Sequence, residues 1–316
     1  MKRILTLLLV VIMTLTSLPA YCESGTWTSF STTPWQEETL RGNLDSVYVD
    51  GHFYSTDVGF DEAEEVDTFC FKVDGEVKFN IDTDTSPRGI ARIGSTVYVA
   101  LVDGIFKYSD GEPDNVVNFP KGVYIYGIVS NNKDLYVYTG SDRYKVDGMA
   151  GFKASFYKVT PSGTITTIKG TDFFEYYTNG IAVNSSGDRI AYIPYMDTGT
   201  IIKRSDGSEY DQRIQDTFDF NGDFFPNAIL YYKDCLIVND HNTLYIYDIT
   251  YDKNGKEINH RQQVLRSDIN VGEIFSWNIG TDGNVYGWTS INYETYSFKW
   301  VVPDKIKTVV SYKKKK

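Results

Sequence analysis

The sequence predicts an all-β protein, a β-propeller of six blades with four antiparallel strands each; seven blades are the alternative. Three observations lead to this prediction. Tyrosine, phenylalanine and tryptophan make up 15% of the 316 residues, and such side chains suit the half-buried surfaces of sheets. Short aromatic and β-branched runs alternate with turn signals such as Asp74-Gly75 and Asp282-Gly283, without helical periodicity beyond about two turns. A hairpin pattern also recurs with a period of about 46 residues, which is typical of propellers.

Each repeat begins with two apolar strands joined by a tight turn. In the second repeat, Gly89-Ile90-Ala91 leads through Gly94-Ser95 to Val97-Tyr98-Val99. A third strand follows, often with an aromatic residue and a lysine, as in Phe69-Cys70-Phe71-Lys72, and a weaker fourth strand comes after it. An open sandwich or two smaller β domains would also contain short periodic strands, but the repeated order of strands favours the propeller.

Residues 1–22 are interpreted as a secretory signal peptide. Lys2 and Arg3 precede an apolar run of about 15 residues, which is too short to cross a membrane. Cleavage is expected after Cys22 or, alternatively, after Ala20, and the bulky Tyr21 argues against a lipid anchor on Cys22. We therefore expect a bacterial protein that is exported to the periplasm or the extracellular space.

Three further segments follow the signal peptide. Residues 23–39 form an N-terminal segment, in which residues 26–30 could supply the closing strand of the last blade. Residues 40–312 form a single propeller domain, and residues 313–316 form a basic tail of four lysines. Cys70 and Cys235 are the remaining cysteines, and we expect two buried, unbonded thiols.

The excess of acidic over basic residues limits the classes of molecule that the protein could bind. The formal net charge is −11, and negative charge repels the phosphates of nucleic acids. No membrane span is expected after the signal peptide, and a monomer is expected. The partner is predicted to be a small molecule, a glycan or a protein.

One position in each repeat differs in residue type from repeat to repeat, whereas the residues on either side of it are similar. It lies two residues before the first apolar anchor of the repeat, and the six residues there are Asp45, Arg88, Tyr126, Asn179, Asn227 and Trp277. In a propeller these positions would surround one mouth of the central channel, which is where a scaffold places a ligand site. The alternative is that they are ordinary turn and strand-start residues. The predicted function is therefore a binding or scaffold protein that recognises its ligand or partner at the channel mouth, rather than an enzyme.

One repeat also resembles a known family. Residues 179–183 (Asn-Gly-Ile-Ala-Val), 190–193 and 197–202 are similar to a blade of the NHL and SMP-30/gluconolactonase-like six-bladed propellers. The resemblance implies a divalent cation such as calcium at the channel mouth, with Asn179, Asn227 and Asp45 as the ligands available here. It also implies the alternative function, a metal-dependent lactonase or hydrolase. The carboxylate that this family carries next to the asparagines is absent, and an amide cannot act as a general base.

Overall fold

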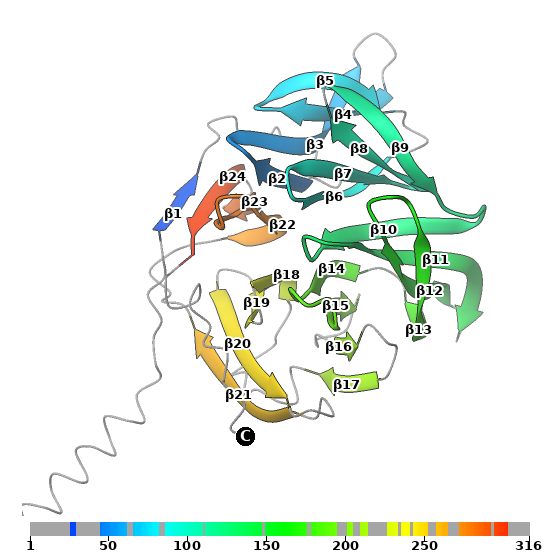
Figure 1. Ribbon diagram of the computed structural model, residues 1–316, viewed down its shortest axis with the longest axis vertical. Helices are drawn as coiled ribbons and strands as arrows, with labels where there is room; N and C mark the ends of the chain where they lie inside the picture. Colours follow the sequence, from blue (N-terminus) through cyan, green and yellow to red (C-terminus); the bar gives the residue numbers. More distant parts are fainter. Residues whose placement is uncertain are drawn as a thin grey trace, which may run out of the picture.

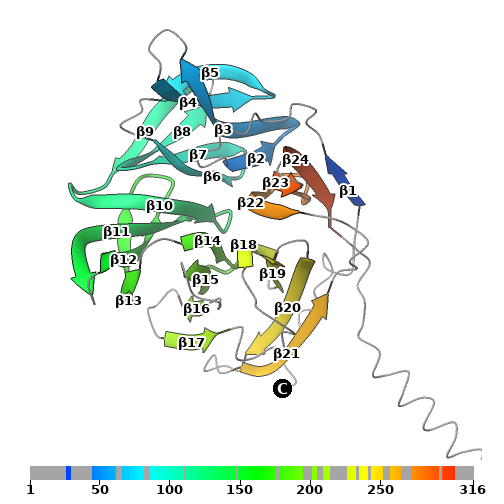
Figure 2. The same cartoon turned by 180° about the vertical axis from the view of Figure 1, so that it is seen from behind.

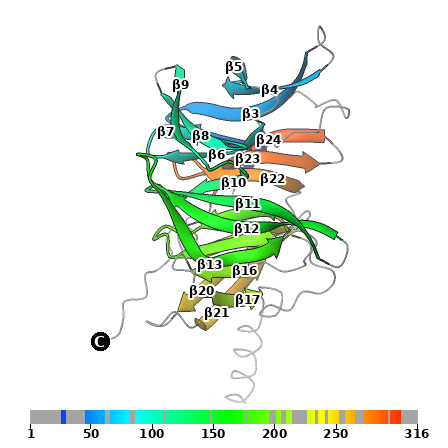
Figure 3. The ribbon, with the colours of Figure 1, turned by 90° about the vertical axis from the view of Figure 1, so that its right-hand side faces the viewer.

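The computed structural model is an all-β ring of sheets. It describes residues 26–29, 45–61, 66–81, 86–109, 111–146, 149–175, 178–194, 201–204, 209–213, 226–232, 235–240, 243–251, 257–264, 272–291 and 294–302. The described strands form six four-stranded antiparallel sheets arranged around a centre, as Figure 1 shows. Figure 2 gives the same ring from behind, and Figure 3 shows it edge-on. The predicted β-propeller is confirmed.

The blades follow one another along the chain, and in the first five the strands run in sequence order from the centre outward. Blade 1 consists of β2 (Asp45–Val49), β3 (His52–Asp61), β4 (Val66–Val73) and β5 (Glu76–Ile81). Blade 2 consists of β6 (Pro87–Ile93), β7 (Thr96–Leu101), β8 (Gly104–Ser109) and β9 (Glu112–Asn118). Blade 3 consists of β10 (Val123–Ser130), β11 (Leu135–Val146), β12 (Met149–Val159) and β13 (Ile165–Glu175).

The second half of the ring repeats this order. Blade 4 consists of β14 (Thr178–Val183), β15 (Arg189–Pro194), β16 (Ile201–Arg204) and β17 (Glu209–Arg213). Blade 5 consists of β18 (Pro226–Tyr232), β19 (Cys235–Asp240), β20 (Thr243–Tyr251) and β21 (Glu257–Val264). Blade 6 consists of β22 (Glu273–Ile279), β23 (Val285–Ile291), β24 (Glu294–Val301) and, from the other end of the chain, β1 (Thr26–Ser29).

The ring is closed by the N-terminal strand. β1 pairs antiparallel with β24, and Trp27 lies opposite Trp300 in the ladder. The expected closing strand of the last blade is therefore confirmed. The alternative of seven blades depended on the third repeat, which is long enough to contain a further blade. In the structure this length lies in long strands: β11, β12 and β13 have 12, 11 and 11 residues.

Apolar side chains are buried between neighbouring blades. Phe71, Ile90 and Val97 belong to the cluster between blades 1 and 2, and Tyr138 and Tyr192 belong to the cluster between blades 3 and 4. The high aromatic content therefore serves the contacts between sheets, where large rings bury the most area.

Two glycines show how closely the innermost strands approach each other. A Cβ atom on Gly89 would lie 2.9 Å from Cγ2 of Ile128 in the next blade, and one on Gly180 would lie 3.2 Å from Cγ2 of Ile229. The recurring Gly-Ile pair thus reflects packing, since the glycine of one blade makes room for the isoleucine of the next.

Several sequence predictions are tested by the described residues and others lie outside them. Cys70 and Cys235 are both buried and are not joined by a disulfide, as expected. Within the described residues, no helix is long and apolar enough to cross a membrane. The signal peptide, most of residues 23–39 and the basic tail lie outside the described residues.

Candidate functional site

A β-bulge marks the start of five of the six innermost strands. The ladder between each innermost strand and its neighbour skips one residue there, and the skipped residues are Arg88, Tyr126, Asn179, Asn227 and Phe275. Bulges redirect single side chains and are common next to functional sites. Four of the six residues that the sequence grouped therefore occupy equivalent positions.

Arg88 and Tyr126 lie side by side at this ring of bulges. The guanidinium carbon of Arg88 is 5.8 Å from the centre of the Tyr126 ring, a cation–π distance. Nε of Arg88 is buried and has no hydrogen-bond partner among the described residues. For Asn179 and Asn227 the structure describes the backbone positions only.

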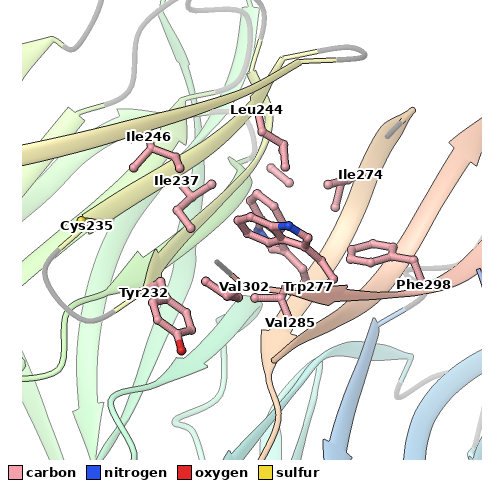
Figure 4. Close-up of a cluster of buried hydrophobic side chains, with 12 residues drawn as sticks. Tyr232, Cys235, Ile237, Leu244, Ile246, Ile274, Trp277, Val285, Phe298 and Val302 are labelled. Carbon is pink, nitrogen blue, oxygen red and sulfur yellow. The ribbon is translucent and has the colours of Figure 1, made fainter. Parts of the chain in front are cut away.

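Trp277 does not lie at the ring of bulges, and its sequence placement was wrong. In the ladder Trp277 is opposite Gly287, two residues after the bulge at Phe275, so it occupies the place that Ile90 has in blade 2. Its indole is 6% exposed and lies in the apolar cluster between blades 5 and 6, as Figure 4 shows. Nε1 donates a hydrogen bond to the carbonyl of Ile229 at 2.9 Å.

Phe275 holds the position that had been assigned to Trp277. Its side chain is 41% exposed, although the residues one place before and two places after it are buried. The sequence comparison used Ile279 as the apolar anchor of the sixth repeat, whereas the ladder shows that Trp277 is the equivalent residue.

The carboxylate of Asp45, the first residue of β2, is hydrogen-bonded to neighbouring innermost strands. It accepts hydrogen bonds from the main-chain nitrogens of Ser46 (2.8 Å) and Ile90 (2.7 Å), and from Nδ2 of Asn278 at 3.2 Å. These contacts join blades 1, 2 and 6 at the centre of the ring. Burial is the main influence on this carboxyl and raises its pKa from 3.8 to about 7, against the lowering effect of the hydrogen bonds.

The predicted cation site at Asp45, Asn179 and Asn227 stays a prediction, because the side chains of the two asparagines lie outside the described residues. Both carboxylate oxygens of Asp45 accept hydrogens from the protein. Among the described residues, no three histidine, cysteine, aspartate or glutamate side chains gather as a possible metal site.

Asn278 was missed by the sequence analysis. Besides Asp45, its Nδ2 lies 2.7 Å from the carbonyl of Ser46 and 3.2 Å from the carbonyl of Ile90. The ladder aligns Asn278 with Ala91, Val129, Ala182 and Leu230 of other blades. A single amide at a position that is otherwise apolar was the signal that could have found it.

Arg92 is the second missed residue, and it crosses the centre of the ring. From β6 its Nε donates to the carbonyl of Ile279 at 2.7 Å, and Nη2 donates to the carbonyl of Gly280 at 2.9 Å. Nη1 donates to the carbonyl of Gly94 and to Oδ1 of Asn132, both at 3.1 Å. The guanidinium thus ties blade 2 to blades 3 and 6, and its partial burial lowers its pKa.

A cavity of about 300 Å³ lies beside the side chain of Arg92. One wall is apolar and comes mainly from the innermost strands of blades 4 and 5, with Ile181, Val183 and Leu230. The lining from blades 2, 3 and 6 includes the polar residues Arg92, Asn132 and Asn278 beside the apolar Val129 and Ile279. Trp277 also lines the cavity, alone among the members of the predicted ring whose side chains the structure describes.

The cavity lies toward the end of the channel opposite to the bulges. Its lining includes Asn131 and Asn132, in the turn between β10 and β11, and Ser185, in the turn between β14 and β15. The bulges lie at the other ends of the same innermost strands. The sequence analysis had considered only the mouth at which the innermost strands begin.

The comparisons with known proteins support the fold. The sequence matches no protein-family profile and no curated protein. A luciferin-regenerating enzyme superposes with a TM-score of 0.53 at 11% identity, covering 88% of this chain and 95% of that chain. A putative oxidoreductase (glucose dehydrogenase) from Thermus thermophilus gives a TM-score of 0.50 at 11% identity, covering 85% of this chain and 99% of that chain.

A scaffold-type propeller is equally similar. The WD40 domain of Pan2 from Neurospora crassa gives a TM-score of 0.50 at 11% identity, covering 90% of this chain and 98% of that chain. Likenesses at this identity show the propeller fold alone, because one fold carries many functions. The specific resemblance to NHL and SMP-30-like propellers stays a prediction.

The pKa of Asp45 predicts a distinctive dependence of stability on pH. Between pH 3.8 and about 7 the folded protein holds a proton at Asp45 that the unfolded chain has released. The free energy of unfolding should therefore fall as the pH rises through this interval and level off above it. Urea unfolding at pH 5, 6, 7 and 8 measures the slope, and Asp45→Asn should make it shallower. Equal slopes in the two proteins would contradict the assignment.

Proposed function

We propose that this protein is a binding protein that holds a small amphipathic molecule in the axial cavity. The observation that carries the proposal is a cavity lining that combines apolar side chains with a few polar ones. Ile181, Val183 and Leu230 offer a surface for hydrocarbon, and Arg92, Asn132 and Asn278 supply polar groups. Ligand sites typically combine a mostly apolar lining with a few fixed polar groups in a volume of about 300–1,000 Å³.

Hydrogen bonds hold the polar groups of the cavity lining in fixed orientations, and this favours ligand binding. Oδ1 of Asn132 accepts hydrogen bonds from Nη1 of Arg92 and from the main-chain nitrogen of Gly94 at 2.8 Å. Asn278 is fixed by its contacts to blades 1 and 2. Groups that are already oriented lose little conformational entropy when a ligand arrives, so more of the contact energy appears as affinity.

A small molecule fits this site better than the other two predicted partners, a glycan or a protein. The cavity is enclosed by innermost strands and their turns, whereas a protein partner needs a broad surface. We also propose that the chain is exported and binds its ligand in the periplasm or outside the cell. The support for export is the signal-peptide pattern of residues 1–22.

A neutral fluorescent probe tests the proposal. N-phenyl-1-naphthylamine fluoresces in apolar surroundings, and we expect it to bind the protein at a single saturable site. Leu230→Trp should weaken that binding about tenfold or more, because the larger side chain would fill the apolar part of the cavity. Val77→Trp is the matched control, since Val77 is 50% exposed on the outer strand β5.

The two variants separate the possible outcomes. Loss of binding in Leu230→Trp with retention in Val77→Trp, both with a wild-type circular dichroism spectrum, would support the cavity as the site. Absence of saturable binding to the wild type, or equal binding by both variants, would contradict the proposal.

A further inference from the structure

Arg92 is a partly buried cation whose contacts within the described residues are electrically neutral. Its four acceptors there are the carbonyls of Ile279, Gly280 and Gly94 and the amide oxygen of Asn132. Charges withdrawn from water in proteins are normally paired with an opposite charge. Here the guanidinium donates to dipoles alone, which leaves its unit charge uncompensated by direct contact in this part of the chain.

The nearest acids do not supply the missing anion by contact. Asp50 and Asp282 act on Arg92 only through space and raise its pKa against the larger effect of burial. The carboxylate of Asp282 is engaged elsewhere, with Oδ2 2.7 Å from the hydroxyl of Tyr286 and 3.2 Å from Nζ of Lys299. Asp50 is an exposed turn residue.

The guanidinium also retains an N–H donor beside the cavity. An arginine side chain has five N–H groups, and the four hydrogen bonds of Arg92 use one on Nε, two on Nη1 and one on Nη2. One N–H on Nη2 therefore remains without an acceptor in the described ranges. Nδ2 of Asn132 likewise has no acceptor among the described residues, while its Oδ1 is held against Arg92.

We propose that the cavity selects an amphipathic carboxylate, with the carboxylate at Arg92 and Asn132 and the hydrocarbon on the wall formed by Ile181, Val183 and Leu230. This inference rests on the proposed function and adds the charge of the ligand to it. The carboxylate would supply the counter-charge and accept the remaining N–H groups. A charged hydrogen bond of this kind is stronger than one between neutral groups.

A series of ligands with the same chain tests the selection. Decanoate, decanol and decylammonium would each compete with N-phenyl-1-naphthylamine for the wild-type protein at pH 7.5, below the micelle-forming concentrations of the two ions and the solubility limit of decanol. We expect decanoate to displace the probe at a concentration about tenfold lower than decanol. Decylammonium should be the weakest competitor, because its charge has the same sign as Arg92.

Two variants connect the preference to the residues. Arg92→Met should bring the ratio between decanoate and decanol to about one. Asn132→Gly should reduce the ratio about threefold, and glycine accepts the positive φ of 67° found at Asn132. This second variant keeps the proposal testable if Arg92→Met fails to fold.

The outcomes separate this inference from the proposed function. If the neutral probe does not bind, both fail. If the probe binds but decanoate and decanol compete equally, or decylammonium competes best, the cavity is a binding site and the selection of a carboxylate is wrong. Retention of the decanoate preference in both variants would also overturn the assignment to Arg92 and Asn132.

Discussion

Trp277→Ala is expected to lower the free energy of unfolding by about 3–5 kcal/mol, the usual cost of removing a large buried aromatic side chain. The indole is 6% exposed and packs among buried side chains of blades 5 and 6, including Ile237 and Phe298. The substitution would also leave the carbonyl of Ile229 without the hydrogen bond from Nε1. Urea unfolding monitored by circular dichroism measures the change.

Phe275→Ala provides the matched control, because it removes an aromatic side chain two residues earlier on the same strand. Phe275 is 41% exposed, so its loss should cost about 0.5 kcal/mol or less. Similar losses in the two variants would mean that the ladder register of β22 is wrong. A small loss for Trp277→Ala alone would return this residue to the exposed ring where the sequence had placed it.

Arg92→Met is expected to lower the free energy of unfolding by about 2–4 kcal/mol. The methionine keeps the apolar stem of the arginine but loses all four hydrogen bonds, three of which tie blade 2 to blades 3 and 6. Hydrogen bonds to charged groups are worth about 1.5–3 kcal/mol each, and the desolvation of a partly buried charge offsets part of their sum. Differential urea unfolding of the variant and the wild type checks the value.

Arg92→Lys distinguishes charge from geometry. A lysine keeps the positive charge but has no planar fork with which to reach two blades at once. We expect Arg92→Lys to lose at least half as much stability as Arg92→Met. Wild-type stability in both variants would show that the guanidinium does not clamp the ring.

Much of the fold could be predicted from the sequence because the relevant signals are local. Tight turns such as Gly94-Ser95 join short apolar strands, and both features depend on near neighbours in the chain. The number of blades followed from counting these hairpins. The closing strand near Thr26 was also predictable, since a propeller whose last blade has three strands needs a fourth from elsewhere.

The candidate site was only partly predictable. Arg88 and Tyr126 were placed correctly at equivalent positions, because their repeats share the same apolar anchor. Trp277 was misplaced, since a large aromatic residue replaces the isoleucine that marks this position elsewhere. The chemical use of the ring of bulges stays a prediction.

The sequence alone therefore determines a ring of short hairpins and its approximate period, which arise from local turn chemistry and recurring apolar runs, and a closing strand, which the incomplete last blade requires. The tertiary structure decides which residues face the channel and which are buried between blades. One extra residue at a bulge changes the side-chain direction for the rest of a strand without a clear compositional mark. The tertiary structure also determines the polar contacts at the centre of the ring, since Arg92 and Ile279 are separated by 187 residues. Only closure of the ring brings that guanidinium and that carbonyl within hydrogen-bond distance.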